Sequence, residues 1–176
     1  MLFATRRDYN FGLRKYFQVK LMEQECCPRL DPKKWDGKVL AWKNKQFVKA
    51  SVFTLFFMPI NFGQVIGKVY GQVQKAGAAS KDNLCLSDHT SKWNMDIYLD
   101  VNKPVKGLTN VKLSGKYLCK VYEGGFQKTG EWCKDFDAYA KKHKLKVGKM
   151  FMWYTTCPKC AKKYGKNYVV IIAKVG

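Results

Sequence analysis

Apolar and polar positions follow two different periods along the chain after residue 46. A stretch rich in β-branched and aromatic residues over 46–58 predicts a strand. Apolar residues then recur at three- and four-residue spacing over 62–73, which predicts a helix with one buried stripe and Asn61 as its N-cap. Two more strands are expected over 83–88 and 93–101, the second from its alternation of apolar and polar positions.

The same order of elements recurs in the second half of the chain. Residues 111–122 predict a strand, 129–140 a helix with one apolar stripe, and 149–156 and 167–175 two final strands. The chain is therefore β-α-β-β twice, with a period of roughly 64 residues. We expect an α+β fold in which the duplicated units form an antiparallel sheet with two main helices, related by a pseudo-two-fold axis. Such a fold has a cleft where its halves meet, and clefts are where ligands bind.

The first 45 residues mix charged, aromatic and turn residues without a sustained period, which predicts an extension with one short helix near 16–24. Trp35 and Trp42 are expected to pack this extension onto the core. The predicted organisation is thus an N-terminal extension over 1–45 and a domain over 46–176, with repeats at 46–102 and 110–176.

Composition adds a packed core and a strongly basic surface to this picture. Of the 176 residues, 47% are hydrophobic and 15% aromatic, which excludes global disorder. The net charge of +20 comes mainly from lysines spread between Lys15 and Lys174 without a long block. That distribution is typical of a solvated surface, and it leaves weak nucleic-acid binding open as a secondary property.

Targeting signals and familiar enzyme motifs are absent from the sequence. No run approaches the roughly 18 uncharged apolar residues of a membrane span. Charges also interrupt the N-terminal stretch where a signal-peptide core would lie. We therefore expect a cytoplasmic monomer or dimer without membrane contact. A nucleophile elbow, a phosphate loop and a dinucleotide fingerprint are likewise missing.

Several motifs, in order, resemble those of a known family, the GyrI-like small-molecule-binding domain. They are the strand-to-helix junction YEGGF at 122–126, the strand end YTTCP at 154–158, and the first-half tract LSDHTSKWNMDIYLDV. The resemblance covers about 46–176, and its specificity lies in the order of the motifs. The family is named for a DNA gyrase inhibitory protein and is related to effector-binding domains of multidrug-sensing transcription regulators.

The resemblance implies a groove between two β-α-β-β repeats that binds hydrophobic, often cationic, compounds. It also implies a second activity, because some members are hydrolases of cyclopropane-containing compounds that use a tryptophan and a glutamate. Where the family pattern places its pocket glutamate, this chain has Met152. That carboxylate would neutralise a cation or act as a general base, so other acids must take either role here.

Other carboxylates of the chain are candidates for these roles. Strand alternation puts Asp96, Tyr98 and Asp100 on one face of the strand, which is either a solvated face or the ligand groove. Glu123 lies at the turn before the second helix. Asp96 and Glu123 are the candidate catalytic acids.

Aromatic side chains are the other candidates for contact with a flat or cationic guest, since their π-faces attract cations. The same rings are equally compatible with core packing. The candidate ligand-binding residues are Trp93, Tyr98, Asp100, Phe57, Met152, Trp153 and Tyr154.

The seven cysteines are expected to be thiols, because no export signal precedes them. Cys157 and Cys160 have C-x-x-C spacing in a predicted hairpin, and Cys26 and Cys27 precede a proline in the extension. Four thiolates from these two segments would bind zinc and tie the extension to the hairpin. A redox dithiol and unmetallated thiols are the alternatives.

Three functions follow from the sequence. The first is a stand-alone protein that sequesters or senses a hydrophobic or cationic small molecule in a cleft between the repeats. The second is a hydrolase of a strained or electrophilic xenobiotic, with a cleft carboxylate that activates water. The third is a zinc-containing basic nucleic-acid binder.

Overall fold

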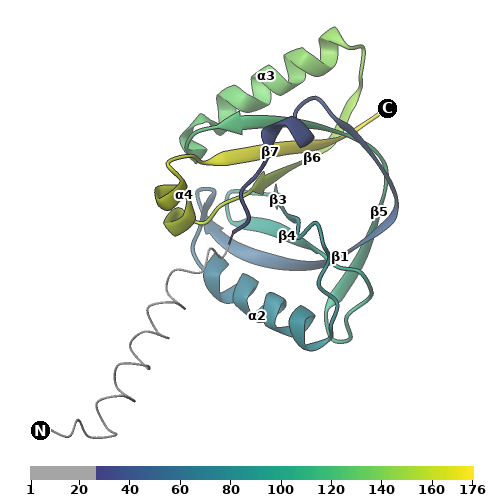
Figure 1. Ribbon diagram of the computed structural model, residues 1–176, viewed down its shortest axis with the longest axis vertical. Helices are drawn as coiled ribbons and strands as arrows, with labels where there is room; N and C mark the ends of the chain where they lie inside the picture. Colours follow the sequence, from purple (N-terminus) through teal and green to yellow (C-terminus); the bar gives the residue numbers. More distant parts are fainter. Residues whose placement is uncertain (1–26) are drawn as a thin grey trace, which may run out of the picture.

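The computed structural model describes residues 27–176 (Figure 1). The helix expected near 16–24 and Cys26 lie outside the described residues. The elements are, in order, η1 (Pro32–Lys34), β1 (Val39–Leu55), β2 (Met58–Pro59), α2 (Phe62–Lys75), β3 (Cys85–His89), β4 (Asn94–Asp100), β5 (Thr109–Glu123), η2 (Phe126–Lys128), α3 (Thr129–Lys142), β6 (Val147–Tyr154), α4 (Pro158–Tyr164) and β7 (Tyr168–Val175).

The strands form one antiparallel sheet that closes on itself. Its order is β2-β1-β4-β3-β6-β7-β5, and an additional pairing of β1 with β5 joins the two ends. Each repeat contributes its strands in the same arrangement, because β4 lies between β1 and β3 just as β7 lies between β5 and β6. The repeats meet at equivalent strands, β3 with β6 and β1 with β5. The predicted α+β fold with a pseudo-two-fold relation is therefore confirmed.

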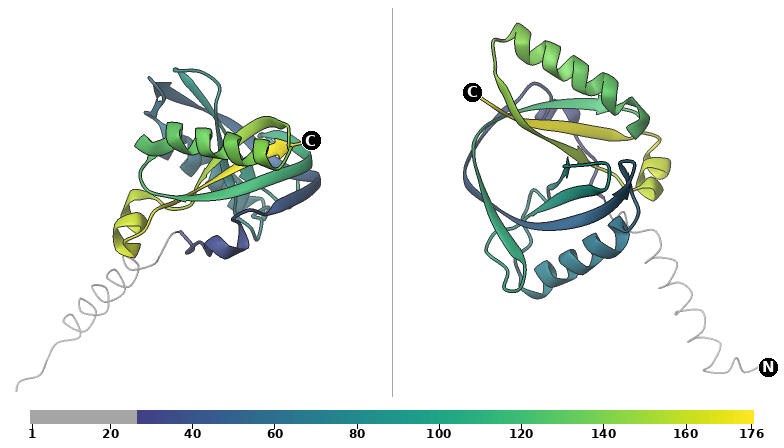
Figure 2. Two further views of the ribbon diagram at one scale, coloured as in Figure 1. Left: turned by 90° about the horizontal axis from the view of Figure 1, so that it is seen from above. Right: turned by 180° about the vertical axis from the view of Figure 1, so that it is seen from behind.

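The two long helices cover the outer face of the sheet from opposite sides (Figure 2). Val69 and Val73 of α2 pack against Val48 and Leu99 of the first repeat. Trp132 and Phe136 of α3 do the same for the second repeat, in a cluster that includes Leu118, Met152 and Ile171. Among the described residues, no helix combines the length and apolar character that a membrane crossing requires.

The inner face of the sheet carries a second, aromatic core. Phe47, Tyr98, Tyr117, Phe151 and Trp153 belong to one buried cluster there, together with aliphatic residues of β3 and β7. The segment 27–38 lies against this cluster and is shown crossing in front of the sheet (Figure 1). Its Trp35 ring meets the Trp153 ring edge to face, with centroids 4.8 Å apart.

The first strand begins at Val39, whereas the sequence pattern places its start near 46. Residues 39–42 pair with 115–118 of β5, and a bulge then follows before Lys45. Asn44 has a φ of 53° in this bulge. The bulge shifts the alternation of inward and outward side chains, so the residues before it do not continue the two-residue period of the strand after it. Trp42 consequently lies in the sheet itself.

Asn61 stands at the N-cap position of α2, but its side chain does not cap the helix. Its Oδ1 instead accepts a hydrogen bond from the backbone N–H of Phe53, at 2.9 Å. The residue therefore ties the start of α2 to β1.

The stretch expected to be a hairpin after β6 contains the short helix α4. Pro158 occupies the first turn and Gly165 ends the helix with a φ of 66°. Proline is preferred in the first turn of a helix and glycine just after its end, so the sequence did contain signals for both ends of α4. The C-x-x-C spacing consequently lies at the beginning of a helix.

Candidate functional site

The inner face of the sheet carries both aromatic and charged side chains across β1, β4, β3 and β6. Lys49 of β1 lies opposite Tyr98 of β4, and Tyr98 lies opposite Leu86 of β3, which in turn pairs with Trp153 of β6. Residues paired in this way share one face of the sheet, as do residues two positions away. The row therefore crosses the junction between the two repeats.

Tyr98 is the point at which lysines from both repeats converge. Lys49 Nζ lies 5.8 Å from the centre of the Tyr98 ring, and Lys149 Nζ lies 5.1 Å from it. Lys149 Nζ also donates a hydrogen bond to the Tyr98 hydroxyl at 3.1 Å. Lys149 is on β6, so this contact joins the second repeat to the first.

Lys49 forms an ion pair with Asp96, which is buried on the inner face. The Nζ to Oδ2 distance is 2.7 Å, and the Oδ1 of Asp96 accepts hydrogen bonds from Ser51 and Asn94. Burial works against ionisation of this carboxyl, but the hydrogen bonds from Lys49, Ser51 and Asn94 hold the pKa of Asp96 below its usual value. Asp96 is therefore an ionised acceptor at neutral pH, and the hydrogen bond raises the pKa of Lys49.

Lys149 forms the corresponding pair with Asp88 of β3, at 2.8 Å. Partial burial alone would lower the pKa of Lys149, yet the hydrogen bonds to Asp88 and Tyr98 raise it above the usual value. Asp88 and Asp96 are paired directly across β3 and β4. Like charges in that position repel, and the two lysines offset this repulsion.

A third pair lies further along the same face. Lys45 Nζ contacts Asp100 at 3.0 Å and Asp82 at 3.1 Å. The Ser80 hydroxyl donates to Asp100 at 2.7 Å. Burial raises the pKa of Asp100, and the bonds from Ser80 and Lys45 only partly oppose this effect.

At the charged end of the inner face two lysine side chains reach solvent, whereas the aromatic end is covered. The side chains of Lys49 and Lys149 are 34% and 48% exposed. Trp153 is only 8% exposed, because Trp35 packs against it. The lysines are thus the more accessible part of this face, and they lie over an aromatic wall formed by Tyr98, Phe151 and Trp153.

The structure brings together four of the residues that the sequence singled out. Asp96, Tyr98, Asp100 and Trp153 all lie on the inner face. Asp96, Tyr98 and Asp100 are buried there, so the alternative of a solvated strand face is wrong.

The other candidates lie elsewhere in the molecule. Met152 and Tyr154 alternate with Trp153, so they face outward and pack in the cluster beneath α3. Trp93 and Phe57 are about half exposed, near the β1–β2 turn. Glu123 is exposed at the end of β5, opposite Tyr168, on a strand that does not pair with β4.

Sequence reasoning missed the lysines Lys49 and Lys149 and the acid Asp88. The alternation of strand faces could have indicated the two lysines. Lys49 follows Phe47 by two positions and Lys149 precedes Phe151 by two, so each lysine shares a strand face with a core aromatic residue. A lysine in a strand is ordinarily solvated, so the pattern alone did not distinguish these two from the remaining lysines.

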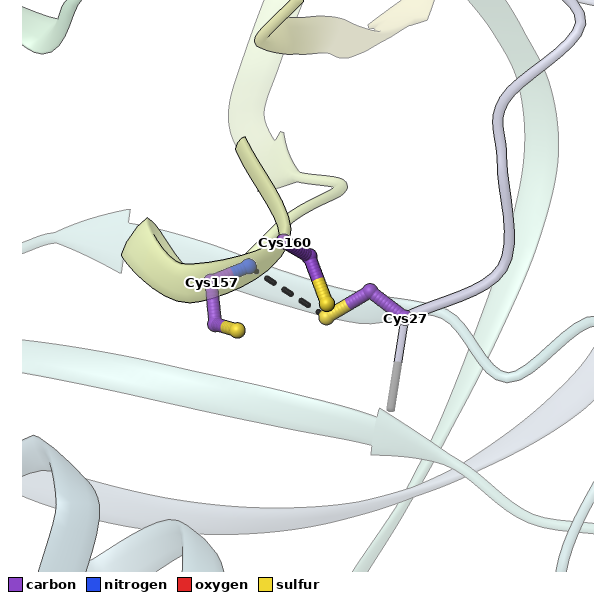
Figure 3. A group of neighbouring side chains, drawn as sticks. All are labelled: Cys27, Cys157 and Cys160. Carbon is purple, nitrogen blue, oxygen red and sulfur yellow. Dashed lines mark hydrogen bonds between the residues drawn. The ribbon is translucent and has the colours of Figure 1, made fainter. Parts of the chain in front are cut away.

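Cysteines from the two ends of the described chain form a second cluster. The Sγ atoms of Cys27, Cys157 and Cys160 lie within 4.8 Å of one another (Figure 3). Beside this cluster is a small open pocket of about 160 Å³, lined by Arg29, Leu30, Thr156, Tyr164, Lys166 and Tyr168. Cys26, the fourth cysteine of the sequence prediction, lies outside the described residues.

Comparison with known proteins gives a family and a fold. A family model described as bacterial hydrolase matches residues 17–175. No curated protein matches the chain.

Several solved structures share the fold at low sequence identity. The C-terminal domain of EcmrR has a TM-score of 0.64 at 10% identity, with 81% of this chain and 98% of that chain covered. An uncharacterized conserved protein from Listeria innocua has a TM-score of 0.60 at 10% identity, over 92% and 98%. A hydrolase from Listeria innocua has a TM-score of 0.57 at 11% identity, over 90% and 97%. At these identities the likeness concerns the fold alone.

Proposed function

The chain belongs to the bacterial hydrolase family, and from that premise we propose that it binds a small, flat hydrophobic molecule at the seam between its two repeats. The observation that carries this proposal is the convergence of Lys49 and Lys149 on Tyr98 from opposite repeats. The resemblance to GyrI-like domains supports the same conclusion, because their groove also lies between the repeats.

The proposed ligand is uncharged or anionic rather than cationic. Each inner-face carboxylate already has a lysine partner, in the pairs Asp96–Lys49, Asp88–Lys149 and Asp100–Lys45. The lysine ammonium groups also occupy the positions over the aromatic rings that a cationic guest would take. A cation would have to displace one of them, whereas an anionic group would pair with the exposed ammonium of Lys149.

Binding of two fluorescent dyes of opposite charge tests this proposal. Anilinonaphthalene sulfonate is a flat anion and thioflavin T a flat cation. We expect saturable binding of one sulfonate dye per chain, and a loss of affinity of about tenfold in Lys149→Met, equivalent to about 1.4 kcal/mol. Thioflavin T should bind more weakly than the sulfonate dye.

Lys142→Met is the matched control, because it removes the same charge from an exposed position on α3. It should leave the affinity for the sulfonate dye within about twofold of the original, a difference below about 0.5 kcal/mol. Equal losses in the two variants would mean that the dye responds only to net charge, and the proposed seam site would be wrong. Tighter binding of thioflavin T would overturn the proposed ligand charge.

Hydrolysis is the second candidate function, favoured by the name of the family and by the two opposed carboxylates at the seam. In this reaction Asp88 would take a proton from water as the water oxygen attacks a carbonyl carbon. The ammonium of Lys149 would stabilise the oxyanion. As the carbonyl re-forms, the alcohol would leave with the proton that Asp88 had taken, which regenerates the carboxylate. Asp88 suits the role better than Asp96, since its side chain is 17% exposed and that of Asp96 is 8%.

A chromogenic nitrophenyl ester tests this second candidate. Hydrolysis should exceed the rate in buffer and fall by about a hundredfold in Asp88→Asn, within the range expected for loss of a general base. The exposed Asp137→Asn on α3 should keep the original rate. Equal rates in the two variants would exclude Asp88 as the base.

A further inference from the structure

Three cysteines from segments far apart in the sequence meet at one end of the molecule. Cys27 opens the described chain, whereas Cys157 immediately precedes α4 and Cys160 lies in its first turn. All their Sγ atoms lie within 4.8 Å of one another. In Figure 3 the sulfur atoms of Cys27 and Cys160 approach each other, with Cys157 beside them.

We propose that Cys27, Cys157 and Cys160 are ligands of a zinc ion that fastens the N-terminal segment to α4. Zinc is four-coordinate in structural sites and binds thiolate at about 2.3 Å, which separates tetrahedral sulfur ligands by roughly 3.8 Å. The observed spacing requires a contraction of at most about 1 Å to reach that geometry. Soft thiolate ligands also favour zinc over magnesium, calcium and manganese.

A backbone hydrogen bond supports one of these ligands. The N–H of Cys157 donates to Cys27 Sγ at 3.3 Å. A donor aimed at a sulfur atom stabilises its thiolate form and orients it, which is how outer partners of a metal ligand act. The same bond already joins the two segments that the ion would link.

The charge around the cluster suits an anionic metal centre. Three thiolates and one Zn²⁺ carry a net charge of −1, and a neutral fourth ligand leaves that charge unchanged. Helix α4 has no acidic residue and contains Lys159, Lys162 and Lys163, and Arg29 lies two positions after Cys27. These cations offset the charge of the thiolates, which favours deprotonation on metal binding.

Neighbouring contacts show what the ion would hold in place. The Tyr164 hydroxyl of α4 donates to the backbone carbonyl of Cys27. The Arg29 guanidinium lies 4.1 Å from the centre of the Tyr164 ring. The segment that continues from this attachment carries Trp35 to the inner face of the sheet. Zinc would therefore fix the start of segment 27–38, which covers Trp153 through Trp35, whether or not a ligand binds at the seam.

Metal analysis of the full chain tests the proposal directly. Protein purified under reducing conditions without added metal should contain close to one zinc ion per chain by elemental analysis and native mass spectrometry. Replacement by Co²⁺ should give the intense near-ultraviolet band of thiolate-to-cobalt charge transfer together with visible bands typical of tetrahedral cobalt. Absence of both zinc and these bands would overturn the proposal.

Variants identify the ligands. Cys27→Ser, Cys157→Ser and Cys160→Ser should each weaken zinc binding by at least tenfold in competition with a chromophoric chelator. Cys133→Ser on α3, outside the cluster, should keep the original affinity. Cys160 is buried, so its serine variant is the one of the three that is most prone to misfold. Circular dichroism of every variant therefore checks the fold. Cys27→Ser is the decisive variant, because Cys27 is less buried.

The redox alternative predicts a different result. If the cluster is a dithiol pair, the protein will be free of metal, and mass spectrometry after alkylation will find a disulfide between Cys157 and Cys160 that a reductant opens. That result would exclude the zinc site. Retention of full zinc affinity in Cys27→Ser would likewise exclude Cys27 as a ligand.

Discussion

Asp96 is an ionised side chain inside the closed sheet, held there by Ser51, Asn94 and Lys49. Its hydrogen bonds depress the folded-state pKa relative to 3.8. A carboxyl with a depressed folded pKa stabilises the protein above its unfolded pKa, and this contribution is lost as the pH falls through the folded pKa. The sheet therefore depends on Asp96 at neutral pH and not in acid.

Replacing this carboxylate should show that dependence. Asp96→Asn is expected to lower the free energy of unfolding by about 1–3 kcal/mol at neutral pH, because buried donors lose a charged acceptor. In urea titrations at decreasing pH, the difference from the original protein should shrink below pH 3.8. Asp135→Asn, whose side chain is 55% exposed, should cost less than about 1 kcal/mol. A pH-independent cost at Asp96 would contradict this account.

At the scale of elements, the turn between β1 and β2 is strained and apolar. Its two central residues, Phe56 and Phe57, have φ values of 47° and 70°. A two-residue hairpin turn of this kind prefers Asn and Gly, because bulky side chains are strained at positive φ. Both rings are also at least half exposed, so they contribute little burial in return.

Relieving that strain should stabilise the hairpin. The double substitution Phe56→Asn with Phe57→Gly is expected to raise the free energy of unfolding by about 1 kcal/mol, measured by thermal and urea unfolding. Phe53→Gly is the contrasting control, since Phe53 is equally exposed but lies within β1. Glycine there should destabilise the strand. A loss of stability in the double variant would mean that the two rings make contacts worth more than the strain.

The segment 27–38 acts as an element of the fold although it contains only a short 3-10 turn. Gly37 N–H donates to the Cys119 carbonyl, Cys119 N–H donates to the Lys38 carbonyl, and Val121 N–H donates to Asp36. The segment therefore joins the edge of β5 and places Trp35 against Trp153.

Removing the ring of Trp35 should expose the aromatic wall. Trp35→Ala is expected to lower the free energy of unfolding by about 2–3 kcal/mol, somewhat less than for a fully buried tryptophan. The same variant should bind more anilinonaphthalene sulfonate, because Trp153 becomes accessible. Trp93→Ala, at a position that is 49% exposed, should change stability by less than about 1 kcal/mol and leave dye binding unchanged. Unchanged dye binding in Trp35→Ala would argue against a ligand site at the Trp153 surface that Trp35 covers.

At the scale of the whole molecule, the two repeats share one closed sheet and one excess of positive charge. The net charge of +20 is distributed over both halves of the sequence. Such a surface attracts polyanions without reading their sequence, since the contacts are with phosphates. Nucleic-acid binding stays a prediction of this kind, distinct from the seam site.

The salt dependence of DNA binding separates these properties. Affinity for a short duplex, measured by fluorescence anisotropy, should fall by more than about tenfold between 50 and 200 mM salt and should not depend on the duplex sequence. Lys149→Met and Lys142→Met should have the same small effect, because each removes one charge. Sequence-dependent binding that tolerates salt would instead indicate a dedicated nucleic-acid site.

Local periodicity accounts for the elements that could be predicted. The stripes of α2 and α3 and the alternation in β4 and β5 depend on neighbours within a few residues, so their positions in the sequence suffice. The duplication then determined the class of fold, because equivalent units bury equivalent faces. The start of β1 was hidden by its bulge, and α4 was overlooked although Pro158 and Gly165 marked its ends.

Contacts between distant segments were decided only by the tertiary structure. The sequence alone determined two repeats, their two long helices and most of their strands, and the alternation that groups Asp96 with Tyr98. It did not determine that Lys49 and Lys149 meet over that ring, that Trp35 covers Trp153, or that Met152 faces α3. Sheet order and closure set these contacts, because they bring together residues dozens of positions apart whose local patterns are those of ordinary surface and core.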